Sequence, residues 1–341
     1  MILHSSCLKE PFLLQNKRET GILVFLLVSL LISFVPQSFG EEDLQVRYDA
    51  ALELLYTRQF EKAQEAFLAL GEYADSARLA AFSLSYPASE PEFGTPFYNR
   101  WKISREYEHG ILYSHSLGMF YVPEKVDPHT TFELYYCGGD REEDYIYYSG
   151  LYKYFDNYFP DAILFFCNES GYNHMEEKNA QMYQELQRLA YDCGTIVHDL
   201  STIGSSVGCY TALKAAAQYY TDYGQIVNNV CTLDTGLYWK DPFHNLTEKE
   251  CDRIAEAGTV FYLFEEPGVG TDVPAIRMMV EHGIPVYVIE CAHANHSVIS
   301  QLAYTYGVFS WCAGEDLFLS EEEYTILKLT ADETEANHVR N

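Results

Sequence analysis

Basic residues are scarce in this chain. Lysine and arginine together number 22 among 341 residues, against 50 aspartates and glutamates, which gives a formal net charge of -28 at pH 7. Such a charge repels the phosphate backbone of nucleic acids and the surface of an anionic membrane. We therefore exclude nucleic acid as the main partner. The hydrophobic share of 48% and the charged share of 21% are typical of a globular chain with a sizeable core.

Paired cysteine motifs are also missing. The nine cysteines are scattered singly, without a CxxC pair, and Cys137, Cys167, Cys231 and Cys291 fall in or at the ends of apolar runs. This pattern predicts small buried side chains rather than a zinc site or a disulfide framework, although an exported protein could still form one or two bridges. Nothing in the sequence points to a cofactor, and we expect none.

Charged residues are absent from positions 21–40, which read GILVFLLVSLLISFVPQSFG. Lys17 and Arg18 precede this run, so the segment has the charged start, apolar centre and small exit residues of a secretory signal. Its most apolar part is short for a membrane span, but the whole uncharged stretch could span if it were left uncut. Residues 1–40 are therefore predicted to be a signal peptide cleaved before Glu41 or an N-terminal membrane anchor. Either alternative predicts a secreted or extracytoplasmic protein.

Residues 41–86 have a helical pattern, with a third helix expected over 73–84. The sequence resembles a single tetratricopeptide-type unit, in which two amphipathic helices cross at alanines. One such unit cannot bury its own apolar face, so we expect it to dock on the main domain, to act as a spacer or to contact another protein. Residues 87–103 begin with three prolines in eleven positions and are predicted to be a linker. The two amphipathic helices within 41–86 are expected from two apolar stripes, which consist of Tyr48, Ala51, Leu54 and Leu55, and of Phe60, Ala63, Phe67 and Leu70.

Short apolar runs alternate with amphipathic segments over residues 104–319. This alternation predicts a mostly parallel sheet with helices on both faces, whose sites lie at the carboxyl ends of the strands. The first part of the C-terminal tail 320–341, residues 320–329, fits either an acid-capped helix or an edge strand. We expect strands at 110–115, 117–122, 131–136, 162–167, 195–203, 226–233, 259–264 and 285–290, and helices at 145–159, 176–190, 207–220, 248–257, 273–282 and from 297.

The segment Gly204-Ser-Ser-Val-Gly208 fits the G-x-S-x-G pattern of a nucleophile elbow. A predicted strand precedes it and an alanine-rich helix follows. A turn this tight needs small residues two positions before and after the serine, and it presents the hydroxyl at the positive end of the helix dipole. The pattern predicts that Ser206 is a nucleophile; the alternative is a structural glycine turn.

The order of these elements around the GSSVG turn resembles the α/β-hydrolase fold, and most of all its esterase branch, over residues 104–318. The resemblance implies an oxyanion hole made by the N–H of Val207 and an N–H of Gly138 or Gly139. Family members usually have a histidine before this glycine pair, where this chain has Cys137. A plain Gly-Gly turn is the alternative.

The acid and the base of a catalytic triad are implied by the same resemblance. Asp272 stands in the turn after the next-to-last strand, where the family places its acid, although an aspartate is also common there as a helix cap. His296 closes the loop after the last strand and opens a helix, as the family's base does. The alternatives are Glu265, Glu266 or Asp234 for the acid and His293 for the base.

His293 and His296 could instead be two metal ligands, with Asp272 or Glu290 as a third. That spacing works only if both histidines lie on one helix, and the strand before them argues against it. We therefore expect no metal.

The predicted reaction is acyl transfer from an ester to water. Ser206 would attack the carbonyl, and His296 would activate the water that releases the acyl group. The expected substrate is a small-molecule ester or an ester on a polysaccharide. The rival hypothesis is a catalytically silent hydrolase fold that serves as a binding or cell-surface interaction module.

Overall fold

The computed structural model describes residues 41–89, 96–136, 155, 161–167, 175–206, 208–233, 246–265, 274–292 and 307–330. The chain divides into two compact units, residues 1–46 and residues 47–341. Of the first unit only residues 41–46, the start of helix α2, are described. Among all described residues, no helix is long and apolar enough to cross a membrane, and the predicted export segment lies outside them.

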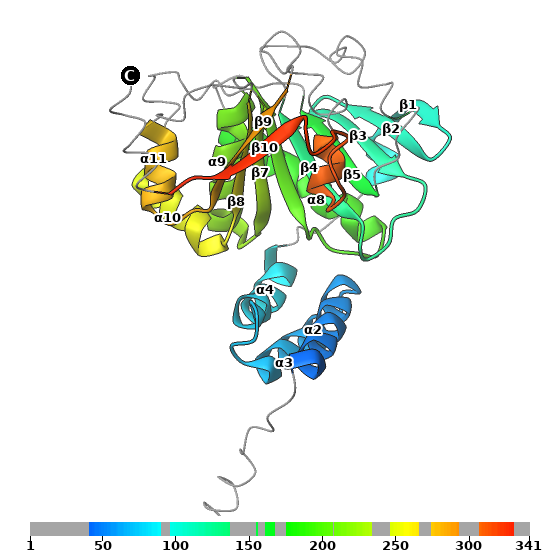
Figure 1. Cartoon of the computed structure of the whole chain (residues 1–341). Helices are drawn as coiled ribbons and strands as arrows, with labels where there is room; N and C mark the ends of the chain where they lie inside the picture. Colours follow the sequence, from blue (N-terminus) through cyan, green and yellow to red (C-terminus); the bar gives the residue numbers. More distant parts are fainter. Residues whose placement is uncertain are drawn as a thin grey trace, which may run out of the picture. The chain divides into compact units, whose positions relative to one another are not determined.

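Three helices open the described chain (Figure 1): two where the apolar stripes predict them, and a third, expected over 73–84, that lies at Ser76–Ser89. They are α2 (Glu41–Tyr56), α3 (Phe60–Leu70) and α4 (Ser76–Ser89). Helix α3 buries Ala63, Phe67 and Leu70, whose spacing of four and three places them on one face. The likeness to a tetratricopeptide unit stays a prediction.

These helices contact the rest of the second unit through polar groups. The Arg58 guanidinium donates a hydrogen bond to the carbonyl of Thr195 (3.1 Å), and that of Arg78 donates to the carbonyl of Ala257 (2.7 Å). The backbone N–H of Val197 donates to the hydroxyl of Tyr86 (3.0 Å), whose side chain is fully buried. The helical segment is therefore docked rather than free-standing.

The predicted linker over 87–103 needs correction at both ends. Helix α4 continues through Pro87 to Ser89, where a missing N–H affects only the last turn. Residues 97–103 form helix α5 (Phe97–Arg100) and the start of a strand. The rings of Phe97 and Trp101 are buried and stacked, with centroids 5.2 Å apart, and this apolar contact holds the segment in the core.

The sheet has the strand order β1-β2-β3-β5-β4-β6-β7-β8-β9-β10. The six strands from β5 to β9 are parallel, while β1, β2, β3 and β10 pair antiparallel at the two sides. Their bounds are β1 Lys102–Tyr107, β2 Gly110–His115, β3 Gly118–Pro123, β4 Thr131–Tyr136, β5 Ala162–Cys167, β6 Leu200–Ser205, β7 Val227–Leu233, β8 Val260–Glu265, β9 Val286–Cys291 and β10 Tyr324–Lys328.

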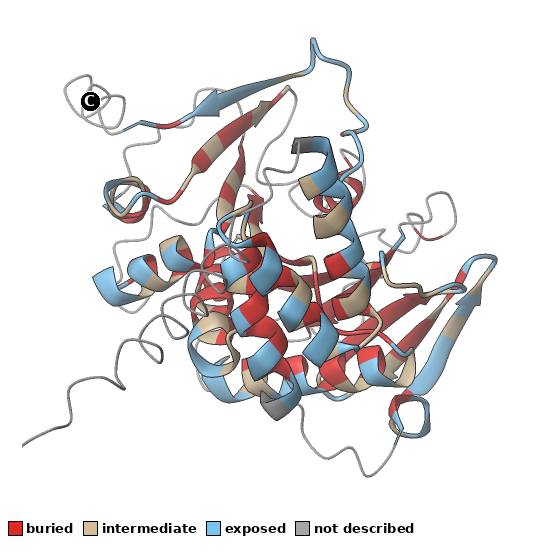
Figure 2. Ribbon diagram, turned by 90° about the horizontal axis from the view of Figure 1, so that it is seen from below, coloured by how far each residue is buried: buried red, intermediate tan, exposed pale blue. Residues whose placement is uncertain are grey.

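Helices cover both faces of this sheet. Helix α9 (Gly208–Tyr223) packs against β4, β6 and β7 and is flanked by α8 (Met175–Asp192) and α10 (Glu248–Ala257). Helix α11 (Pro274–Glu281) contacts β9, and α13 (Val308–Cys312) packs on the opposite face. The pattern of burial agrees with this layering. Figure 2 shows the buried residues, in red, along the strands and on the inner sides of the helices.

Local signals explain where several elements begin and end. Helix α10 starts at a capping box, in which the Thr247 hydroxyl accepts from the N–H of Glu250 while the Glu250 carboxylate accepts from the N–H of Thr247. It ends at Gly258, whose φ of 72° is the left-handed conformation that glycine adopts most easily. The apolar runs at 131–136 and 162–167 form β4 and β5 with the predicted bounds.

The predicted fold class is confirmed: the chain has the α/β-hydrolase arrangement of a mostly parallel sheet with helices on both faces, preceded by a small helical segment. At the start of the tail, where either a helix or an edge strand was expected, the structure has the edge strand β10. The helix predicted over 145–159, apart from Phe155, and the helix expected from 297 lie outside the described residues.

Candidate active site

Ser206 stands in the turn between β6 and α9, near the middle of the sheet. Its φ is 50°, a left-handed conformation that costs a residue with a side chain about 1–2 kcal/mol. Hydrogen bonds hold the turn on both sides. The Ser206 N–H donates to the carbonyl of Leu233 (3.3 Å), and the Cys209 N–H donates to the carbonyl of Ser206 (3.1 Å). This strained strand-to-helix turn is the geometry that the G-x-S-x-G pattern predicts.

Gly204 is required where strand and helix cross. A Cβ built on Gly204 would lie 2.4 Å from the carbonyl oxygen of Gly208 and 2.5 Å from the Cα of Cys209. Both neighbours are backbone atoms, which cannot move aside without displacing the start of α9. The first glycine of the motif is therefore a packing requirement of the elbow itself.

The structure separates the two serines of the motif. Ser205 is fully buried, and its Oγ accepts a hydrogen bond from the hydroxyl of Tyr135 (3.0 Å). Ser206 is half-buried and is placed by the strained turn. Of the two, Ser206 is thus the one whose backbone matches the predicted elbow, and its role as a nucleophile stays a prediction. Tyr135 was missed in the sequence analysis, because its role depends on the pairing of β4 beside β6.

The strands on both sides of β6 end at the level of this turn. Tyr136, the last residue of β4, is in register with Gly204, and Leu233, the last residue of β7, is in register with Ser205. The chain positions that follow, including the predicted oxyanion glycines and Asp234, therefore start from the strand ends that flank Ser206. Those residues themselves lie outside the described ranges.

Glu265 is the described candidate for the acid. It ends β8, is buried, and is in register with Glu290 of β9. Strand β7 separates β8 from β6, so the two strands lie about 10 Å apart at a spacing of about 4.8 Å per strand. Glu265 therefore starts two strands away from Ser206. The remaining candidates, Gly138, Gly139, Val207, Asp234, Glu266, Asp272, His293 and His296, lie outside the described residues and stay predictions.

Two thiols that also lie at the carboxyl ends of parallel strands are poor nucleophiles. Burial raises the pKa of Cys167, at the end of β5, to about 12. Burial and then the nearby Glu265 carboxylate raise that of Cys291, at the end of β9, to about 12. Both side chains stay protonated near neutral pH, and the thiolate is the nucleophilic form of cysteine. Within the described part of the chain, no group of three acidic, histidine or cysteine side chains could hold a metal.

Comparison with known proteins gives distant likenesses to esterases. The carboxyl esterase 2 of the fungus Tuber melanosporum matches at 12% identity and a TM-score of 0.40, covering 66% of this chain and 93% of that chain. An esterase of Rhizomucor miehei matches at 12% and 0.41, covering 76% and 95%. The hyperthermophilic esterase of Pyrobaculum calidifontis matches at 10% and 0.37, covering 75% and 93%. No family model and no curated protein matches the chain. The fold assignment therefore rests on the sheet order and on the turn at Ser206.

Proposed function

We propose that the protein is a serine hydrolase that cleaves carboxylic esters. The observation that carries this proposal is the whole turn at Ser206: a left-handed, hydrogen-bonded serine between the end of central strand β6 and the start of α9, with Gly204 packed against the helix as a nucleophile elbow requires. Left-handed backbone at a residue with a side chain persists only where the surrounding structure enforces it, and such positions cluster at active sites.

In the proposed reaction, the Oγ of Ser206 attacks the ester carbonyl while His296 takes its proton. The oxyanion that forms is stabilised by the N–H of Val207 and an N–H of Gly138 or Gly139. His296 then gives its proton to the leaving alcohol, and an acyl-enzyme remains. Water, deprotonated by His296, releases the acid and restores Ser206. Asp272 orients the imidazole and stabilises its charged form.

The proposed substrate is a small-molecule ester or an ester attached to a polysaccharide, and no cofactor takes part. We further propose that the protein acts outside the cytoplasm and is directed there by residues 1–40. This segment is either cleaved off before Glu41 or tethers the protein to the membrane through residues 21–40. In this proposal the helical segment 41–86 is available for contact with another protein.

A fluorophosphonate probe tests the proposal, because an activated serine attacks its phosphorus, displaces fluoride and becomes covalently phosphonylated. We expect the wild-type protein to be labelled at Ser206 and the Ser206→Ala variant to remain unlabelled. Ser205→Ala is the matched control: it changes the neighbouring serine, which is buried against Tyr135, and should keep its labelling provided that circular dichroism shows it folded. A folded wild-type protein that no probe labels would instead support the silent binding module.

A further inference from the structure

The two edges of the sheet are built differently. Edge strand β1 has an irregular register between Ile103 and Arg105 and carries the charges of Lys102 and Glu106, features that discourage pairing with another strand. Edge strand β10 pairs with β9 in unbroken register over its five residues. Figure 2 shows it as a pale blue strand beside the more buried β9, and Ile326 and Leu327 are 48% and 47% exposed. Strand β10 is short and ends in Lys328, yet its unbroken register and its exposed Ile326 and Leu327 leave it open to a further strand.

The hydrogen bonds to β9 show which backbone groups of β10 face outward. The Ala292 N–H donates to the carbonyl of Glu323 (2.7 Å), and the Leu329 N–H donates to the carbonyl of Val286 (2.9 Å). In an antiparallel pair, residues bonded to the neighbour alternate with residues that face away from it. The odd positions of β10 therefore face β9. The N–H and carbonyl groups of Tyr324, Ile326 and Lys328 point away from the sheet, and they have no partner within the described part of the chain.

This outward pattern is symmetric about Ile326 and so complements itself. If two copies of β10 run antiparallel about a two-fold axis at Ile326, each outward group meets an outward group of the other copy, with about six hydrogen bonds between them. Lys328 then lies opposite Tyr324 of the second copy, a pairing of a cation with an aromatic ring. The acidic turn before β10, which contains Glu321 and Glu322, comes beside the end of the strand that carries Lys328 of the other copy.

We propose that β10 binds β10 of a second copy of this chain, joining two sheets across a two-fold axis at Ile326. Five residues per strand make a small interface, below the roughly 1,000 Å² that stable complexes bury, so the dimer is weak, with a Kd of about micromolar or higher. The net charge of -28 on each copy opposes association. Salt screens this repulsion and leaves backbone pairing intact, so added salt strengthens the dimer.

Sedimentation velocity on the purified protein tests the proposal at concentrations from about 1 to 100 µM. We expect the dimer fraction to rise with concentration, and to rise further between low salt and about 0.3 M NaCl. Ile326→Pro removes the outward N–H at the axis without removing a bond to β9 and should raise Kd at least about tenfold. Ile326→Val keeps the N–H and the strand preference and should leave Kd unchanged.

Crosslinking keeps the test decisive if Ile326→Pro fails to fold. Ile326→Cys puts one thiol from each copy across the axis, so oxidised glutathione should link two chains. Leu327→Cys is the matched control, because Leu327 lies opposite Thr325 of the second copy and not opposite itself, and it should link poorly. The proposal is overturned by a single-chain mass at every concentration and salt, or by a dimer that Ile326→Pro leaves unchanged and Ile326→Cys does not crosslink.

Discussion

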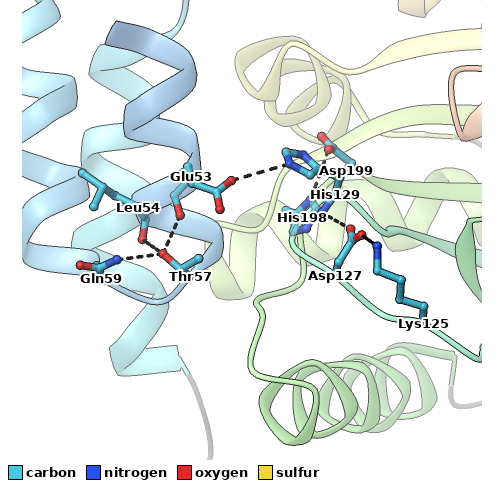
Figure 3. A network of polar contacts seen from close by, with 9 residues as sticks. All are labelled: Glu53, Leu54, Thr57, Gln59, Lys125, Asp127, His129, His198 and Asp199. Carbon is cyan, nitrogen blue, oxygen red and sulfur yellow. Dashed lines mark hydrogen bonds and ion pairs between the residues drawn. The ribbon is translucent and has the colours of Figure 1, made fainter. Parts of the chain in front are cut away.

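The phenol ring of Tyr56 stacks on the imidazole of His198, with ring centroids 3.9 Å apart and planes 17° from parallel. Tyr56 is the last residue of α2, and His198 stands just before β6, at the opposite end of that strand from Ser206. Figure 3 shows the polar contacts of His198 and of the residues near it. His198 Nδ1 lies 3.2 Å from Asp199 Oδ2, and His129 Nε2 lies 3.7 Å from Glu53 Oε2. The helical segment is thus joined to the strand that carries the elbow.

Tyr56→Ala should lower the free energy of unfolding by about 3 kcal/mol, because it removes a buried ring from a packed contact. Fluorophosphonate labelling of the protein that remains folded should not change, since the contact lies at the far end of β6. Urea unfolding followed by fluorescence measures the first quantity. Tyr56→Phe is the control: it keeps the ring and removes only the hydroxyl, which lies near the Asp199 carboxylate, so a loss of no more than about 1 kcal/mol is expected. Equal losses for both variants would show that the stack contributes nothing.

Much of the sheet could be predicted because its strands are buried on both faces. The runs TFELYY and AILFFC need no knowledge of their neighbours to be recognised, and the glycine spacing around Ser206 indicated the elbow directly. Strand β1, KISREY, was not predicted, because at an exposed edge its side chains are mostly polar and carry no hydrophobic period. The extension of α4 through Pro87 was missed for a related reason, since proline signals a break but costs little in a last turn.

The geometry of the candidate site was predictable only where one segment of chain builds it. The turn at Ser206 and the need for Gly204 follow from one short segment, whereas the role of Ser206 as a nucleophile stays a prediction. The hydrogen bond from Tyr135 to Ser205 joins residues 70 positions apart and depends on the pairing of β4 with β6, which the sequence does not state. The acid and the base likewise depend on loops that must return over the sheet, and Asp272 and His296 therefore stay predictions.

Gly204→Ala should abolish labelling of Ser206 and lower the free energy of unfolding by about 3 kcal/mol, because the new methyl group meets backbone atoms of the elbow. Gly283→Ala is a matched control, since Gly283 has a φ of 79° and nothing within 4 Å of the added Cβ. Only the left-handed backbone opposes that change, at about 1 kcal/mol. A Gly204→Ala protein that is labelled like the wild type would contradict the packing argument.

Glu133 is a carboxyl group buried in β4, 1% exposed, and neither of its oxygens has a hydrogen-bond partner among the described residues. Burial, followed by the nearby Cys312 and Glu315, raises its pKa well above the usual range. The folded state therefore holds a proton that the unfolded chain releases above about pH 4.5. This group's contribution to stability is full below that pH and is lost as pH rises toward its raised pKa.

Glu133→Gln should therefore remove part of the decline in stability between about pH 4 and pH 8, and Glu133→Leu should stabilise the protein at pH 8 by at least about 1 kcal/mol. Urea unfolding at several pH values, compared with the wild type at each, isolates the effect. Glu185 is the matched control, because it is equally buried but accepts from Trp101 Nε1 (2.8 Å) and pairs with Arg100. Glu185→Gln should destabilise the protein at pH 8. Parallel pH curves for wild type and Glu133→Gln would contradict the prediction.

The position of β9 bears on which histidine is the base. Strand β9 stays hydrogen-bonded to the segment that leads into β10 for one residue beyond its end at Cys291, because the Ala292 N–H donates to the carbonyl of Glu323. His293 therefore follows the last sheet contact directly. Strand β9 lies three strands from β6, a distance of about 14 Å, and an extended chain covers at most about 3.6 Å per residue. The three residues from 293 to 296 add about 10 Å of reach toward Ser206.

His296→Ala should therefore lower kcat for p-nitrophenyl acetate by about 10⁴-fold, while His293→Ala should cost less than about tenfold. The wild-type rate should rise with pH through the imidazole range, because the base must be neutral to accept the proton of Ser206. Steady-state kinetics between about pH 5 and pH 9 measure both effects, and His293→Ala serves as the matched control for changing a histidine in the same loop. If His293→Ala is inactive and His296→Ala turns over at nearly the wild-type rate, the base is His293, and the loop must fold back toward Ser206 directly from the end of β9.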